Sequence, residues 1–138
     1  MYRHENTVTL LDFIESVFDT GVGLYSFIHN KLEKDFGSQF GHQLKHFVSM
    51  YGLIEEVQSE ADNLRSDILK NKEVDVYDNI EYIMQSINRI SDNVTKKSMV
   101  YLEEIYTKDT GLDDLITELN WFDDELDKIK SFYNEIYQ

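Results

Sequence analysis

The sequence LDDLITELNWFDDELDKIKSFYNEI, residues 112–136, carries an apolar residue at alternating intervals of three and four positions. These apolar residues are Leu112, Leu115, Leu119, Phe122, Leu126, Ile129, Tyr133 and Ile136. Such spacing places one narrow apolar seam along a helix, the repeat with which long helices pack side by side. It predicts a helix over residues 112–137 that packs against the other helices of the chain.

Residues 7–36 are predicted to form a helix with a wider apolar face, because two apolar series interleave there. One series is Leu10, Ile14, Val17, Leu24 and Ile28, and the other is Val8, Leu11, Phe18, Val22, Tyr25, Leu32 and Phe36. We expect this helix to be the most buried one, or to meet a second copy of the protein. Asn6 or Thr7 is the expected N-cap. Gly21 and Gly23 indicate a kink or a close helix crossing, and a break into two helices is the alternative.

Two further helices are predicted between these, over residues 41–71 and 76–107. Glycines at 37 and 41 indicate the turn before the first of them, and Asp75 is the expected N-cap of the second. The second has a seam at Val76, Ile80, Ile83, Ile87, Ile90 and Val94. After Val94 the seam positions are taken by Lys97 and Glu104, which predicts a local rotation of the packing face. The segment 107–111 is the expected turn before the last helix.

Four helices joined by short turns predict an all-α fold, an antiparallel up-down-up-down four-helix bundle with long coiled-coil-like helices. The alternative is a three-helix arrangement with an extended hairpin. The 138 residues suffice for one domain, residues 1–138, with a core of its own. The chain has no proline, which suits helix, and no cysteine, which excludes disulfides and thiolate metal sites.

The chain is strongly acidic, with a formal net charge of −14. Between residues 109 and 127 the acidic residues are uninterrupted by Lys or Arg: Asp109, Asp113, Asp114, Glu118, Asp123, Asp124, Glu125 and Asp127. Such a charge repels nucleic acid and anionic membranes and attracts basic partners, although it also serves as an ordinary solvated face. No secretion signal or apolar run of about 20 residues is present, so we expect a cytoplasmic protein with no membrane contact.

The histidines are candidate metal ligands, because His42 and His46 share a helix face and His29 and Glu33 are spaced in the same way. These four residues are expected to lie near one end of the bundle. The Glu-x-x-His motifs of di-iron bundles are absent, however, and surface histidines near a turn are the favoured interpretation. We therefore expect no metal and no cofactor.

Motifs of catalysis are also missing. The sequence has no phosphate-binding glycine motif and no G-x-S-x-G nucleophile motif. Residues 109–113 offer oxygen atoms without the spacing of a calcium loop. Basic residues are too sparse for direct binding of DNA or RNA. We expect a protein that is not an enzyme.

Trp121 lies outside the apolar seam of the last helix and is expected to face solvent. An exposed tryptophan with an acidic surround combines an aromatic anchor residue with charges that speed the approach of a basic partner. The alternative is that Trp121 folds back over the edge of the bundle. The candidate partner-binding residues are Trp121, Asp114, Glu118, Asp123, Asp124, Glu125 and, more weakly, Tyr82.

The leading functional hypothesis is a binding protein that blocks a basic protein partner, as inhibitors, immunity proteins, antitoxins and phage counter-defence factors do. One alternative is a nucleic-acid mimic whose carboxylates occupy a basic groove. Another is a structural or secretion adaptor that self-associates, for instance as a homodimer. The least favoured alternative is a metal-binding bundle built on the histidines and Glu33.

Overall fold

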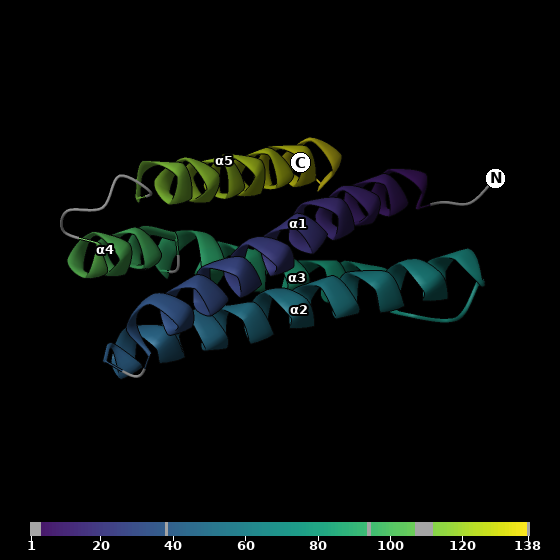
Figure 1. Ribbon diagram of the computed structural model, residues 1–138. Helices are drawn as coiled ribbons and strands as arrows, with labels where there is room; N and C mark the ends of the chain where they lie inside the picture. Colours follow the sequence, from purple (N-terminus) through teal and green to yellow (C-terminus); the bar gives the residue numbers. More distant parts are fainter. Residues whose placement is uncertain (1–3, 38, 94, 107–111, 138) are drawn as a thin grey trace.

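A computed structural model describes residues 4–37, 39–93, 95–106 and 112–137. All regular elements in these ranges are α-helices (Figure 1). They are α1 (Glu5–Phe36), α2 (Gly41–Leu69), α3 (Val76–Asn93), α4 (Thr95–Ile105) and α5 (Leu112–Tyr137). The prediction of an all-helical chain is confirmed. None of these helices combines the length and the apolar composition that a bilayer-spanning segment needs.

The helices α1 and α2 lie side by side along most of their length and are joined by a short turn, while α5 lies along another side of α1 (Figure 1). Gly37 ends α1 with a positive φ of 60°, a conformation that glycine adopts without strain, and its N–H donates to Glu33 O. The expected N-cap was wrong. The helix begins earlier, at Glu5, and Thr7 is buried within its first turn, where its hydroxyl hydrogen-bonds to that of Tyr137.

The turn between α2 and α3 follows the predicted chemistry, although α2 ends at Leu69 rather than residue 71. Asn71 has a positive φ of 55°, which Asn tolerates better than most residues. The Asp75 carboxylate accepts a hydrogen bond of 3.0 Å from the backbone N–H of Asp78. Asp75 therefore caps α3 as expected, and it satisfies one of the N–H groups left free at a helix start.

The third predicted helix is described in two parts, α3 and α4, which lie before and after residue 94; that residue itself is outside the described ranges. The change of packing face expected there is confirmed. Ile87 and Ile90 are buried in α3, and the buried series continues in α4 at Ser98, Leu102 and Ile105 while Lys97 and Glu104 are exposed. The second part, α4, ends at Ile105 rather than at the predicted residue 107. The expected turn at 107–111 lies outside the described residues.

The core contains the seam of α5 and both apolar series of α1, together with apolar side chains of α2, α3 and α4. Leu115, Leu119, Phe122, Leu126 and Ile129 of α5 are all buried. The helix α1 is continuous through its glycines, so the alternative of two short helices is wrong. A Cβ atom on Gly21 would lie only 2.6 Å from Cε1 of Phe122. Gly21 thus allows the close crossing that the sequence indicated.

A buried polar network joins three helices inside this core. The Tyr25 hydroxyl lies 3.0 Å from Ser98 Oγ, and His46 Nε2 lies 2.8 Å from the same oxygen. Tyr25 and Ser98 are fully buried, so each relies on the other elements for its hydrogen bonds. Burial, and to a lesser extent the charge of Asp123, raises the pKa of Tyr25. The network connects α1, α2 and α4 at one defined position.

Candidate partner-binding surface

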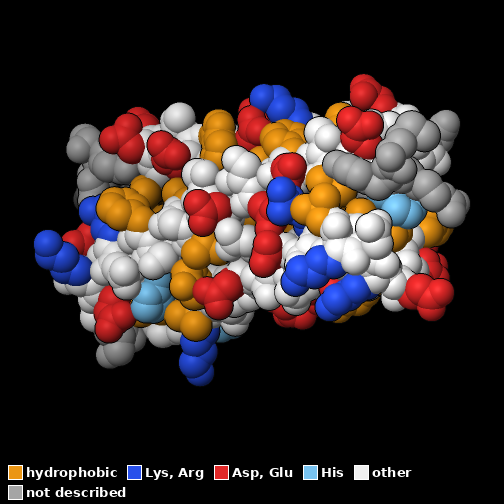
Figure 2. All heavy atoms as spheres, turned by 90° about the vertical axis from the view of Figure 1, so that its right-hand side faces the viewer, with side chains coloured by type: hydrophobic (Ala, Val, Ile, Leu, Met, Phe, Trp, Pro, Cys, Tyr) orange, Lys and Arg blue, Asp and Glu red, His pale blue; other side chains and the backbone are white. Residues whose placement is uncertain are grey.

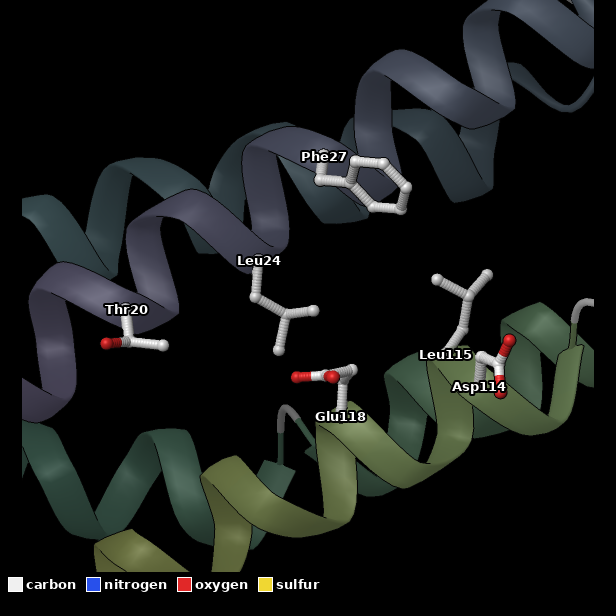
Figure 3. A pocket seen from close by; sticks show the side chains of 6 residues that line it. All are labelled: Thr20, Leu24, Phe27, Asp114, Leu115 and Glu118. Atoms are coloured by element: carbon white, nitrogen blue, oxygen red, sulfur yellow. The ribbon is translucent and has the colours of Figure 1, made fainter.

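A shallow groove of about 340 Å³ lies between α1 and α5. Its walls are Thr20, Leu24 and Phe27 from α1 and Asp114, Leu115 and Glu118 from α5. Figure 3 shows Leu24 and Leu115 extending into the space between the two helices, with the carboxylates along its α5 side. The groove thus has an apolar floor and an acidic edge.

The acidic edge follows from the apolar seam of α5. Leu115 and Leu119 are buried, and the residues immediately before them, Asp114 and Glu118, are exposed. Because they are four positions apart, both carboxylates lie on one face of the helix. Neither forms an ion pair with a side chain in the described ranges. Two carboxylates are therefore available to a cation from outside the chain.

Phe27 is the most exposed of the large hydrophobic side chains in the described part of the chain, with 59% of its surface accessible. It lies between Leu24 and Ile28, which are buried, and belongs to neither apolar series of α1. Phe27 was not among the residues predicted from sequence to bind a partner. The signal was available, because the argument applied to Trp121, an aromatic residue outside the seam, applies equally to Phe27.

Trp121 is 37% exposed and therefore only partly open to solvent. It follows Glu118 by three positions, so it continues the same face of α5 beyond the groove. It does not line the groove itself. Trp121 can contact a partner that extends past Glu118 along α5.

The remaining predicted residues do not form one site with these. Asp124 is exposed, Asp123 is half-buried, and Glu125 is only 14% exposed and bonds to Lys128 Nζ at 2.9 Å. Tyr82, 49% exposed, lines a separate hollow of about 260 Å³. That hollow lies between α2 and α3 and is also lined by Glu60, Asn63, Leu64, Asp67, Val74, Asn79 and Ile83. The structure therefore brings together Asp114 and Glu118, but not Tyr82.

Another hollow, of about 350 Å³, lies on the other side of Phe27 from the groove. It is lined by Phe27, Asn30, Lys31, Lys34 and Asp35. Lys31 Nζ is bonded to Asp35 at 3.2 Å, whereas Lys34 is exposed and has no ion pair among the described side chains. Phe27 therefore separates the acidic groove from a hollow in which Lys34, near Asp35, forms no direct ion pair with a described side chain.

The histidines have other roles than a shared metal site in the described part of the chain. His46 bonds to Ser98, His42 Nε2 lies 3.3 Å from the Tyr101 hydroxyl, and His29 lies 3.7 Å from Glu33. The described residues contain no group of three or more His or carboxylate side chains that could hold a metal ion. Burial is the main cause that lowers the pKa of His46 to about 4, so the imidazole is neutral near pH 7.

On the face drawn in Figure 2 the surface charge is mixed rather than uniform. Viewed from the right-hand side of Figure 1, acidic and basic side chains are interspersed with hydrophobic ones (Figure 2). The net charge of −14 is therefore not a continuous acidic layer on this face.

Comparisons of the chain with protein-family models, with curated proteins and with solved structures found no match. The function is therefore inferred from the surface itself.

Proposed function

We propose that this protein is a non-enzymatic binding protein that blocks a basic protein partner through the face formed by α1 and α5. Inhibitors and immunity-type proteins act in this way, by covering the surface that their target needs. In this proposal Asp114 and Glu118 receive Lys or Arg side chains of the partner, and Phe27 receives an apolar one.

The observation that carries the proposal is the exposure of Phe27 beside two carboxylates that have no ion pair among the described side chains. Aromatic residues are enriched among those that contribute most to interface energy. Complementary charges accelerate encounter and reject partners of the wrong sign. Together they provide the apolar centre and the charged edge of a protein interface.

Mimicry of nucleic acid is less well supported than protein binding. A mimic needs an ordered row of free carboxylates, and the row on this face of α5 runs Asp114, Glu118, Trp121, Glu125. It is interrupted by an aromatic residue, and Glu125 is paired with Lys128. A row with these properties suits a partner that has apolar as well as basic groups.

We further infer an up-down-up-down antiparallel arrangement for the segments α1, α2, α3 with α4, and α5. In support, Thr7 contacts Tyr137, Gly21 contacts Phe122, and Leu24 lies with Leu115 in the groove. Residues with higher numbers in α1 thus lie beside residues with lower numbers in α5. Small-angle scattering combined with spin-label distances between helix ends would test this topology.

The functional proposal is tested by capture of partners from the source cells on immobilised protein. We expect a basic protein that is retained by the native chain and lost with the triple variant Phe27→Ala, Asp114→Asn, Glu118→Gln. Trp121→Ala should weaken retention if the partner extends along α5. The control, Glu56→Gln with Glu73→Gln, removes two exposed carboxylates elsewhere and should retain the partner.

Equal recovery by native and triple-variant protein would show that this face is not the binding surface. If only the protein itself is recovered, self-association replaces partner binding as the better explanation. Sedimentation velocity at micromolar concentration then measures that alternative directly.

A further inference from the structure

We infer that the partner segment is an amphipathic helix that lies along α1. One half of its length carries basic residues, the other half carries acidic residues, and an apolar residue lies between the two halves. The inference rests on the proposed function and specifies the partner class for the same surface. Its basis is the order of groups along α1: the acidic groove, then Phe27, then Lys34.

The helical form follows from the walls of the surface. Both α1 and α5 have their backbone hydrogen bonds internal to the helix, so neither offers the free N–H and C=O groups of a sheet edge. An extended peptide would leave its own backbone unpaired against such walls. A helix satisfies its backbone internally and binds through side chains, as in other helix-in-groove complexes.

The charge order follows from the ionic groups that form no ion pair among the described side chains. Asp114 and Glu118 border the groove on one side of Phe27, and Lys34 lines the hollow on the other. Lys31 is already held by Asp35 and lies 5.6 Å above the ring of Tyr106, so Lys34 is the cation available there. A partner that is basic throughout would place a positive charge against Lys34.

The length of the partner segment follows from α1. The groove and the hollow beyond Phe27 together extend from Thr20 to Asp35 of α1. This distance is about 15 residues, or roughly 22 Å of helix. A partner helix of about four turns would cover both hollows and place its central apolar residue on Phe27. Such a helix fits the spacing of the acidic groove, Phe27 and Lys34 along α1.

The test uses three synthetic amphipathic helical peptides, each with a central leucine and no tryptophan. The first has lysines in one half of its length and glutamates in the other half, with the leucine between them. The second has lysines in both halves, and the third is a scrambled version of the first. Affinities are measured by calorimetry near physiological salt, where surface charges interact over about 8 Å. The emission of Trp121, the one tryptophan of the chain, reports whether the peptide reaches its neighbourhood.

We expect the native protein to bind the first peptide and not its scramble, and Phe27→Ala to weaken this binding about tenfold. Lys34→Glu should shift the affinity ratio of the first and second peptides at least roughly fivefold toward the second. Lys45→Glu, the same charge change at an exposed lysine of α2, should leave that ratio unchanged. These variants are at exposed positions, and thermal unfolding confirms that each remains folded.

Equal ratios for Lys34→Glu and Lys45→Glu would overturn the charge order, and equal binding of the scrambled peptide would overturn the helical partner. A cellular partner that is lost with the triple variant, while no peptide binds, would also overturn this inference and leave the proposed function intact. Absence of both peptide binding and a groove-dependent cellular partner would overturn both.

Discussion

The contact between α1 and α5 has two contrasting regions less than two helical turns apart. At Gly21 the helices are so close that a single added carbon would meet the ring of Phe122. At Phe27, six positions later, the side chain is largely exposed and the helices leave a groove. The first region stabilises the fold and the second contributes little to it. This contrast separates residues packed in the interior from residues exposed at the surface.

The largest expected effect on the free energy of unfolding concerns Leu126, compared with Trp121 on the opposite side of α5. Leu126→Ala should lower the free energy of unfolding by about 2–5 kcal/mol, because Leu126 is fully buried and a cavity would remain. Trp121→Ala should cost about 0.5 kcal/mol or somewhat more, since Trp121 is partly exposed. Urea denaturation measures both. Comparable losses would mean that Trp121 belongs to the core.

A smaller effect is expected at the close crossing itself. Gly21→Ala should destabilise the protein by about 1–3 kcal/mol through overpacking against Phe122, less the gain of about 1 kcal/mol in helix propensity. Gly23→Ala is the matched control, because a Cβ atom there would meet no neighbour within 4 Å, and it should be stabilising. A double-mutant cycle with Phe122→Leu should recover part of the loss at Gly21. A stabilising Gly21→Ala would contradict the close approach.

The smallest effect is a pH dependence on the side of α1 that faces α2. Burial, together with the hydrogen bond and charge of Asp62, raises the pKa of Glu15 to about 7, although Arg65 opposes the shift. The folded state therefore holds a proton that the unfolded chain releases near pH 4.5, and this stabilisation is lost as pH rises through 7. Glu15→Gln should be more stable than the native protein at pH 8, with the difference vanishing near pH 4.5.

The native profile also contains an opposing contribution from His46. Its pKa of about 4 in the folded state means that stability falls as pH drops below 6.5 toward 4. The quantity to compare is thus the difference between native protein and Glu15→Gln at each pH, measured by urea denaturation. A constant difference from pH 5 to 8 would show that Glu15 is not protonated in the folded state.

The buried, closely packed regions could be predicted from sequence, whereas the exposed regions could be predicted only in part. The seam of α5 and the two series of α1 were correctly assigned to the core, because burial imposes a period that local sequence records. The predictions that Gly37 precedes a turn and that Asp75 caps a helix were correct for a similar reason. Turns and caps depend on residues that are near in sequence. Asp114 and Glu118 were proposed as partner-binding residues through their charge, and that role stays a prediction.

The groove itself could not be predicted, because it depends on the distance between α1 and α5. The period of α1 shows that Phe27 is outside the core, but not which helix stands opposite it. The same limit applies to His46. Its ring was expected at the surface, and its bond to Ser98 depends on the rotation of α4 after residue 94.

The hydrogen bonds among Tyr25, His46 and Ser98 also determine the alignment of the helices. Apolar seams are repetitive, and a helix moved along its neighbour by one turn can bury a similar set of side chains. In such a displaced arrangement the Tyr25 and Ser98 hydroxyls would lose their partners inside the core, at a cost of about 1–3 kcal/mol for each unpaired group. Among the many alignments that hydrophobicity alone would permit, the three polar residues therefore favour one register.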